Sequence, residues 1–464
     1  MRVRNGGRHR VRGALLGLLT VLGVLGGCSV TVPGTPNAGT GAVRGEVDTS
    51  FVHGAGRTPV DQVAAAVLLD VQEYWRRSFP ETFGTPWQEL RGGFHSVDTT
   101  EPDTTPPPCA DSATEVEGNA YYCSRADAIV WDRAALLPVL RERFGDVAVV
   151  VVLAHEVGHA VHHRAGIGAA ERLEQPERYP TILTEAMADC YAGSFLRWVV
   201  DGHAGHLDVT PGELDAALDA MITFRDPLGT DRTDREAHGN AFDRVSAFQD
   251  GYQHGAGLCA GMTVDNRRFT LRDFTSLEDQ ASGGNMEFHR MVAAVSDDLN
   301  RYFTALVTRH GHTWRPPTLR ETTGTPRCAG EQGPVAFCPT DGAVELDPSG
   351  DLPRLHRDTG DYATGTLLAT RYGLAALAAM GRPVDGEEAG RAAVCLAGAY
   401  TGEVFQRQEG FGLSPGDLDE AIQVLLHHDY GSRGAPAGAV PSGFDRVALF
   451  RTGTLQGPQA CGID

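Results

Sequence analysis

The chain contains an internal repeat, and this repeat constrains the fold more than any other feature of the sequence. One copy contains "LDVTPGELDAALDAM" followed by "AFDRVSAFQDGYQHGAGLCAG", and the other contains "LSPGDLDEAIQVL" followed by "GFDRVALFRTGTLQGPQACG". The order and the spacing of these segments agree closely, which indicates that one structural unit occurs twice. We therefore predict two homologous domains, over residues 55–264 and 285–464, with a linker over residues 265–284.

The first residues are typical of an export signal. Five arginines within residues 2–12 precede an apolar run over residues 14–27, which is too short for a comfortable membrane span. The run ends in "LGGC" and resembles a bacterial lipobox, in which Cys28 would become the lipidated N-terminus. We expect a lipoprotein signal peptide over 1–27, a flexible tether over 28–54, and a protein anchored at the outer face of the cell membrane. Secretion without an anchor is the alternative.

The other eight cysteines follow the repeat. An even number of cysteines in an exported chain is typical of disulfides. Each copy holds one close pair and one distant pair, and the simplest pairing that suits both copies joins Cys109 to Cys123, Cys190 to Cys259, Cys328 to Cys338 and Cys395 to Cys461.

Composition excludes two broad classes of protein. The chain has 464 residues, of which 41% are hydrophobic, so it is not a disordered protein. Its formal net charge is -20, which argues against a nucleic-acid partner because phosphate binding needs clustered cations. The oligomeric state cannot be read from the sequence.

The strongest chemical signal is the motif that runs from His155 to His159, with Glu156 inside it. The motif continues an apolar stretch, which predicts a buried helix over about residues 147–163. Two histidines four residues apart lie on one face of a helix, so their imidazoles can bind one metal ion. Glu156 stands beside them and is a candidate general base for a metal-activated water.

A catalytic zinc needs a third protein ligand and one open position. Glu185 and Asp189 are four residues apart in "TEAMADCYAGSFLRWVV", a second predicted helix. We predict that Glu185 completes the metal site and that Asp189 orients a ligand imidazole. A solvated acidic face is the alternative, but the small and apolar neighbours of these residues favour close packing.

These motifs resemble those of a known family. HExxH followed by ExxxD resembles the gluzincin arrangement, and "LAHEVGHAV", "EAMADCYAG" and "HGNAFDRVSAFQDGYQHG" resemble the neutral zinc metallopeptidase family of bacteria. The resemblance covers most of residues 60–264 and, more weakly, 285–464. It implies an α+β, zincin-like and largely helical fold, one Zn²⁺, and hydrolysis of a peptide or protein substrate. The alternatives are a non-catalytic zinc-binding or substrate-binding lipoprotein of the cell surface and a metal hydrolase that acts on peptidoglycan peptides.

The second copy lacks the chemical residues of the first. Aligning the copies places five other residues at the positions of the two histidines, Glu156, Glu185 and Asp189, namely Thr370, Leu374, Arg371, Gly390 and Val394. We therefore expect a degenerate second domain that does not catalyse the reaction.

The same alignment suggests further site residues. His238 and Tyr252 are absent from the second copy, and either could stabilise an oxyanion. The segment Asn119-Ala120-Tyr121 could form a sheet edge that binds an extended peptide. By contrast, Phe242-Asp243-Arg244 recurs in both copies, which indicates a structural role, for example in a buried ion pair.

Overall fold

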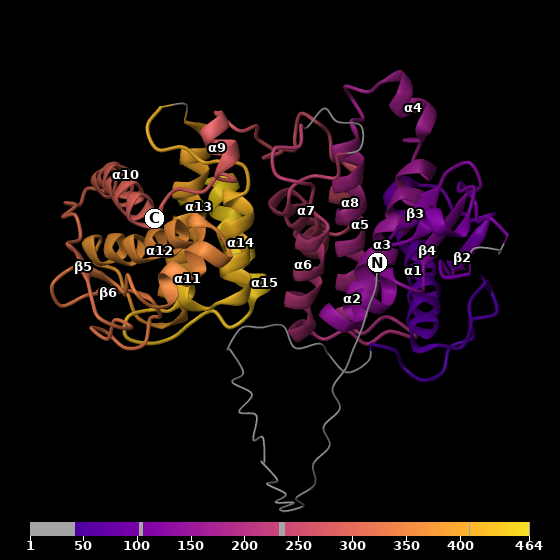
Figure 1. Cartoon of the computed structure of the whole chain (residues 1–464), viewed down its shortest axis with the longest axis horizontal. Helices are drawn as coiled ribbons and strands as arrows, with labels where there is room; N and C mark the ends of the chain where they lie inside the picture. The colour runs from indigo at the N-terminus through magenta and orange to yellow at the C-terminus, as the bar shows by residue number, and fades with distance from the viewer. Residues whose placement is uncertain (1–41, 102–104, 232–236, 408, 464) are drawn as a thin grey trace, which may run out of the picture. The chain divides into compact units, whose positions relative to one another are not determined.

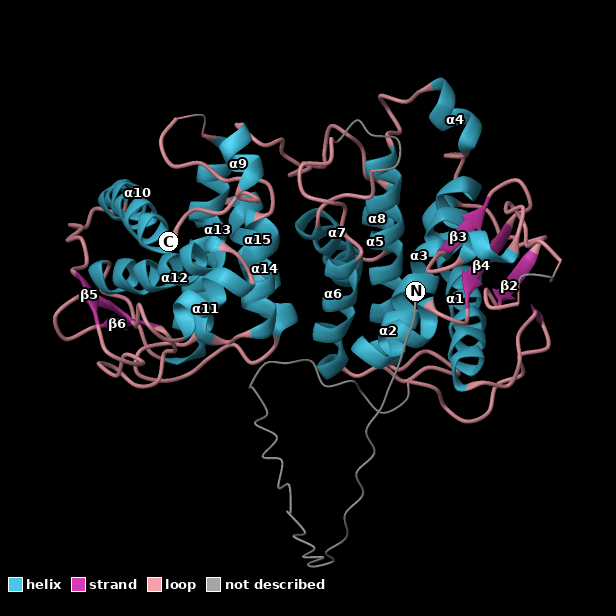
Figure 2. Ribbon diagram, in the orientation of Figure 1, coloured by secondary structure: helices cyan, strands magenta, loops and turns pink. Residues whose placement is uncertain are grey.

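The computed structural model describes residues 42–101, 105–231, 237–407 and 409–463 (Figure 1). Helices predominate and two small sheets accompany them, so the fold is α+β as expected (Figure 2). The predicted signal peptide, the lipidation site Cys28 and the tether up to residue 41 lie outside the described residues. None of the helices in the described ranges has the length and hydrophobicity that a membrane crossing needs.

The N-terminal half combines one sheet with a group of helices. The sheet has the strand order β1-β2-β4-β3, with β1, β2 and β4 parallel and β3 antiparallel to β4 at the edge. Its strands are β1 (Val52–His53), β2 (Gly93–Val97), β3 (Ala120–Cys123) and β4 (Ala128–Asp132). Its α-helices are α1 (Pro59–Phe83), α2 (Leu136–Phe144), α3 (Asp146–Arg164), α4 (Ala169–Glu174), α5 (Thr181–Val200), α6 (Leu214–Thr223), α7 (Ala241–His254) and α8 (Ala256–Ala260).

The C-terminal half presents a similar order of elements. Its sheet has the order β5-β7-β6, with β5 parallel and β6 antiparallel to β7, which matches β2-β4-β3. Its strands are β5 (Leu319–Glu321), β6 (Val335–Cys338) and β7 (Ala343–Leu346). Its α-helices, preceded by α9 (Leu277–Ala281), are α10 (Phe288–Arg309), α11 (Asp351–Asp358), α12 (Asp361–Ala379), α13 (Gly386–Gln406), α14 (Asp417–His427) and α15 (Gly443–Gln456).

Helices α3, α5 and α7 pack closely because glycines stand at their contacts. A Cβ atom on Gly158 of α3 would lie 2.8 Å from the Cα atom of Ala188 in α5. A Cβ atom on Gly251 of α7 would lie 1.7 Å from the carbonyl oxygen of Cys190. The helix predicted over 147–163 is thus observed as α3, and burial on nearly all sides overrides the weak helix propensity of its valines.

Part of the predicted tether is packed rather than flexible. The amide of Ala42 donates to the buried carboxylate of Asp146, and Gln62 exchanges two hydrogen bonds with the backbone of Val47. Val52 then begins strand β1 of the sheet. The expectation of a flexible segment therefore fails for residues 42–54, because their backbone groups and small apolar side chains find partners on the helices and the sheet.

Four disulfides join the predicted cysteine pairs. They are Cys109–Cys123, Cys190–Cys259, Cys328–Cys338 and Cys395–Cys461. In each half, one disulfide ties the strand pair to the loop before it, and the other ties a long central helix to the end of that half.

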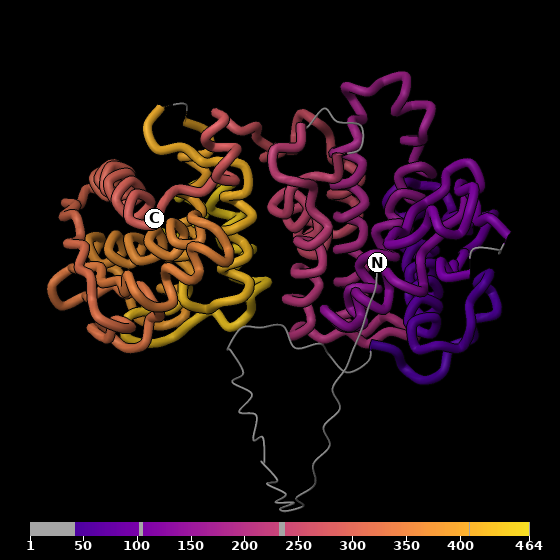
Figure 3. The backbone as a smooth tube through the Cα atoms, in the orientation of Figure 1, coloured from indigo at the N-terminus to yellow at the C-terminus, as the bar shows by residue number. Residues whose placement is uncertain are grey.

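The two halves cap one another's helices. Asp215 of α6 accepts hydrogen bonds from the amides of Gly443 and Phe444 at the start of α15. Asp419 of α14 accepts from the amide of Phe242 at the start of α7. Buried apolar residues of both halves also form one continuous core, and the chain path through it can be followed in Figure 3.

Candidate metal centre

Three side chains from α3 and α5 converge on one point. The Nε2 atoms of His155 and His159 lie 3.1 Å apart, and Glu185 Oε2 lies 3.2 Å from the first and 3.5 Å from the second. Around a tetrahedral Zn²⁺ with bonds of 2.0–2.1 Å, neighbouring ligand atoms are about 3.3–3.4 Å apart. The triangle of ligand atoms therefore has the size that a zinc ion requires.

The chemistry of the three donors also fits a metal ion. Glu185 is 6% exposed, and its Oε2 atom has no hydrogen-bond partner although it is buried. A buried carboxylate oxygen without a donor is costly unless a cation satisfies it. Two imidazoles and one carboxylate form a common donor set of catalytic zinc sites. The residues present thus fit the zinc ion that the motif predicts.

Asp189 is hydrogen-bonded to the first histidine. The Nδ1 atom of His155 donates to Asp189 Oδ1 over 2.7 Å, which leaves the lone pair of Nε2 free for a metal. Burial opposes the charged form of His155, but the carboxylates of Asp189 and Glu185 outweigh it and raise its pKa to about 10. The raised pKa of His155 shows that the surroundings of its ring are strongly negative. The same negative charge would stabilise a bound divalent cation.

Arg244 forms a buried ion pair with Asp189. Its Nε and Nη2 atoms donate to the two carboxylate oxygens, each over 2.9 Å, and its Nη1 atom donates to the carbonyl of Phe224. Burial raises the pKa of Asp189, but Arg244 and His155 lower it more, so the carboxylate stays charged. The buried ion pair expected near Phe242-Asp243-Arg244 therefore exists, and it belongs to the metal centre.

His162 fixes the second histidine, a role that was not predicted from the sequence. Its Nδ1 atom lies 2.8 Å from the carbonyl of Ile167 and must donate to it. Its Nε2 atom then accepts from His159 Nδ1 over 3.0 Å, which leaves His159 Nε2 free for a metal. The available signal was the spacing, because His159 and His162 are three residues apart and lie on one helix face.

The ligands open into a cavity of about 500 Å³. Glu156 lines this cavity, and burial raises the pKa of its carboxyl group. The edge strand β3 borders the cavity, so the predicted peptide-binding segment Asn119-Ala120-Tyr121 lies beside the metal ligands. The cavity therefore connects this sheet edge with the metal ligands.

The structure separates the two candidate oxyanion donors. His238 lines the cavity and is held by Asp226, whose carboxylate accepts from the His238 backbone amide over 2.7 Å. Tyr252 does not line the cavity, which corrects that prediction. Two turns of α7 separate it from Arg244, and its ring packs against Phe444 with the guanidinium of Arg197 over it.

In the C-terminal half, the chain itself fills the positions that the sequence alignment pairs with the metal ligands. Arg371 is fully buried in α12 and donates to the carbonyls of Tyr430, Gly431 and Arg433 and to the side chain of Gln332. Gly390 leaves room for this loop, because a Cβ atom there would lie 1.8 Å from the carbonyl of Ser432. A backbone loop and a cation thus take the space that a metal ion would need.

Comparison with protein families agrees with the site. The chain belongs to the family described as putative neutral zinc metallopeptidase, whose sequence profile matches residues 6–262. That match covers α3 and α5 with all three candidate zinc ligands. Neither the curated proteins nor the solved structures contain a match to the chain.

Proposed function

We propose that the chain is an exported zinc-dependent endopeptidase whose N-terminal half carries the reaction. The observation that supports this proposal most is the convergence of His155, His159 and Glu185 at the floor of a cavity that Glu156 also lines. A purely structural zinc site has no use for Glu156, so this residue favours catalysis over the non-catalytic alternative.

Each residue of the site has one role in the proposed hydrolysis. A bound Zn²⁺ would lower the pKa of a water molecule and polarise the scissile carbonyl group. Glu156 takes the proton from the attacking water and passes it to the leaving amine, a task that suits a carboxyl group whose pKa burial raises. The edge of β3 holds the substrate as an added strand, and His238 donates to the developing oxyanion.

Export and anchoring are part of the proposal. Four disulfides support an oxidising compartment, because they rarely persist in the cytosol. Lipidation of Cys28 would hold the enzyme at the outer face of the membrane. Mass spectrometry of the mature N-terminus tests this part, and a protein that retains residues 1–27 would contradict it.

We propose that the C-terminal half is a degenerate second copy of the N-terminal half and that it stabilises the first copy. Its matching sheet order and its two matching disulfides favour this origin. The reciprocal helix caps of Asp215 and Asp419 suggest what it does, since each half completes the helix ends of the other.

The decisive experiment compares wild type with Glu156→Gln. We expect the variant to keep one zinc per chain and to lose at least about 100-fold in cleavage of a peptide library, because a general base contributes that much. Glu81→Gln, an exposed change on α1, serves as the control and should cleave like wild type. Full activity of Glu156→Gln with zinc bound would refute its role, and zinc-loaded wild type that cleaves nothing would favour a binding protein.

A further inference from the structure

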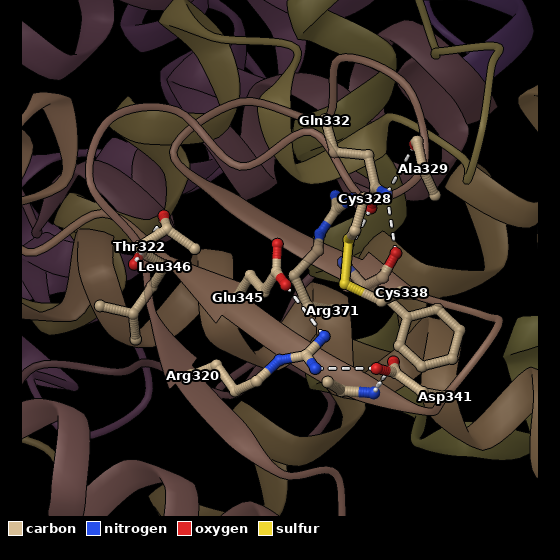
Figure 4. Close-up of a disulfide and its surroundings, with 12 residues drawn as sticks. Arg320, Thr322, Cys328, Ala329, Gln332, Cys338, Asp341, Glu345, Leu346 and Arg371 are labelled. Carbon is tan, nitrogen blue, oxygen red and sulfur yellow. Dashed lines mark hydrogen bonds and ion pairs between the residues drawn. A yellow bond between two sulfur atoms is a disulfide. The ribbon is translucent and has the colours of Figure 1, made fainter.

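The described residues contain two other clusters of side chains that could hold a metal ion. One comprises Cys328, Cys338 and Glu345, but its two sulfur atoms are joined in a disulfide and have no thiolate to offer (Figure 4). The other comprises Asp361, Asp417 and Glu420 in the C-terminal half, and nothing in the proposed reaction accounts for it.

The three carboxyl groups of this second cluster are crowded and buried. Asp361 at the start of α12 is 3% exposed, and Asp417 and Glu420 in the first turn of α14 are 4% and 6% exposed. Each contributes an oxygen atom, and these atoms lie within 4.8 Å of one another. Such proximity of three acids is unfavourable without a positive charge between them.

Their hydrogen bonds leave oxygen atoms unused. Asp361 Oδ2 accepts from the amide of Met286, and Asp417 Oδ2 accepts from the amide of Ser414. The Oδ1 atom of each is buried without a hydrogen-bond partner. Two orphaned carboxylate oxygens in one buried cluster point to a ligand that supplies positive charge.

No described arginine or histidine is ion-paired with these acids, although Arg225 and Arg272 lie close enough to interact with Glu420 and Asp417. Arg225, the nearest cation to Glu420, is bound to Asp419, and Arg272 donates to the carbonyls of Phe405 and Leu413. Burial and the charge of Asp279 raise the pKa of Asp361 to about 6, and burial and the charge of Asp361 raise that of Glu420 to about 8.

The backbone around the cluster is shaped for close approach to the carboxylates. Gly360 has φ of +136°, and a Cβ atom there would lie 1.9 Å from the carboxyl carbon of Glu420. Only glycine leaves room for this side chain beside Asp361. Asp279 reaches the same region from α9, where its carboxylate accepts from the hydroxyl of Ser414.

We propose that Asp361, Asp417 and Glu420 bind one Ca²⁺ ion in the C-terminal half. Carboxylate oxygens alone select a hard cation. Ca²⁺ suits cages of protein oxygens, whereas Mg²⁺ usually keeps several water molecules, and the three acids of this cluster are buried. The bound ion joins α12 to α14 and stabilises the half that lacks the catalytic residues.

The test uses the full chain with its zinc restored after removal of other metals. Titration with Ca²⁺ at pH 7 should show one site per chain and raise the thermal midpoint by about 2–4 °C at saturating ion. Asp417→Asn should fold and abolish both effects, while Asp358→Asn, an exposed acid at the end of α11, should keep them. Zinc content and peptide cleavage at a permissive temperature should not change in either variant.

Three results would overturn the proposal. Wild type could show no Ca²⁺ binding and no shift, which would mean that shared protons satisfy the acids. Asp417→Asn could keep the Ca²⁺ response of wild type, which would place the ion elsewhere. Mg²⁺ could produce the same shift at the same concentration, which would exclude a site built for Ca²⁺. If Asp417→Asn fails to fold, Glu420→Gln provides the same comparison.

Discussion

At the scale of single residues, the site depends on which nitrogen of each histidine is free. Asp189 holds His155 and His162 holds His159, both through Nδ1, so both Nε2 atoms face Glu185. Helical spacing alone indicated that His155 and His159 share one face and that Glu185 and Asp189 share another, because each pair is four residues apart. The support by Arg244 could not be predicted, because 55 residues separate it from Asp189 and only tertiary packing joins them.

Arg244 gives the first prediction. Replacing it by leucine leaves the buried carboxylate of Asp189 without its cation, so we expect the free energy of unfolding to fall by about 3–5 kcal/mol. Zinc affinity should also fall by about 10–100-fold, because His155 loses its fixed partner. Denaturant unfolding and competition with a zinc chelator measure the two effects. Arg354→Leu, at an exposed position, should leave both unchanged.

His162 gives a prediction that separates orientation from stability. His162→Phe keeps a buried ring but removes the acceptor of His159 Nδ1. We expect zinc affinity to fall by about 10–100-fold in chelator competition. His289→Phe, on the exposed start of α10, is the matched control. Unchanged zinc affinity in His162→Phe would contradict the role assigned to this residue.

At the scale of elements, the site is built where α3 and α5 touch through small residues. Gly158→Ala places a Cβ atom against the backbone of Ala188, so the two helices must separate. We expect a loss of about 1–3 kcal/mol in the free energy of unfolding, together with weaker zinc binding because Glu185 moves away from the histidines. Gly257→Ala in α8 meets no atom within 4 Å and should be neutral in both measurements.

The C-terminal end of α14 provides a prediction of pH dependence. Burial, with His427 and Arg446 nearby, lowers the pKa of His428 to about 4. The unfolded chain binds this proton more readily, so the stabilisation is complete above about pH 6.5 and is lost as the pH falls through about 4. His428→Phe preserves the stack on Tyr430 and should reduce this slope by at most about 1.4 kcal/mol per pH unit.

The measurement is denaturant unfolding at a series of pH values between 4 and 7 in wild type and variant. His312→Phe, on the exposed turn after α10, controls for the loss of a histidine. Equal slopes in wild type and His428→Phe would show that other groups cause the acid sensitivity.

At the scale of the whole molecule, the internal repeat predicted more of the structure than the amino-acid composition did. The helices around the motifs, the strand pair before them and all four disulfides follow from comparing the two copies. The division into two homologous domains stays a prediction, and the continuous core joins both halves. The contacts of Asp215 and Asp419 with the opposite half could not be predicted, because sequence similarity between copies does not reveal how they meet.

The packing of residues 42–54 escaped prediction for a related reason. Their composition is that of a linker, and their partners Asp146 and Gln62 are recognised only once the fold exists. Tyr252 was predicted as an oxyanion donor because the second copy lacks this tyrosine. Its position on α7 instead brings its ring into contact with Phe444.

The central claim is that His155, His159 and Glu185 together hold one zinc ion, and metal analysis of the purified chain tests it most directly. We predict one zinc per chain in wild type and almost none in the double variant His155→Ala/His159→Ala after dialysis against a chelator, with Glu185→Gln strongly reduced. Zinc bound at one per chain in the double variant under the same dialysis would contradict the account.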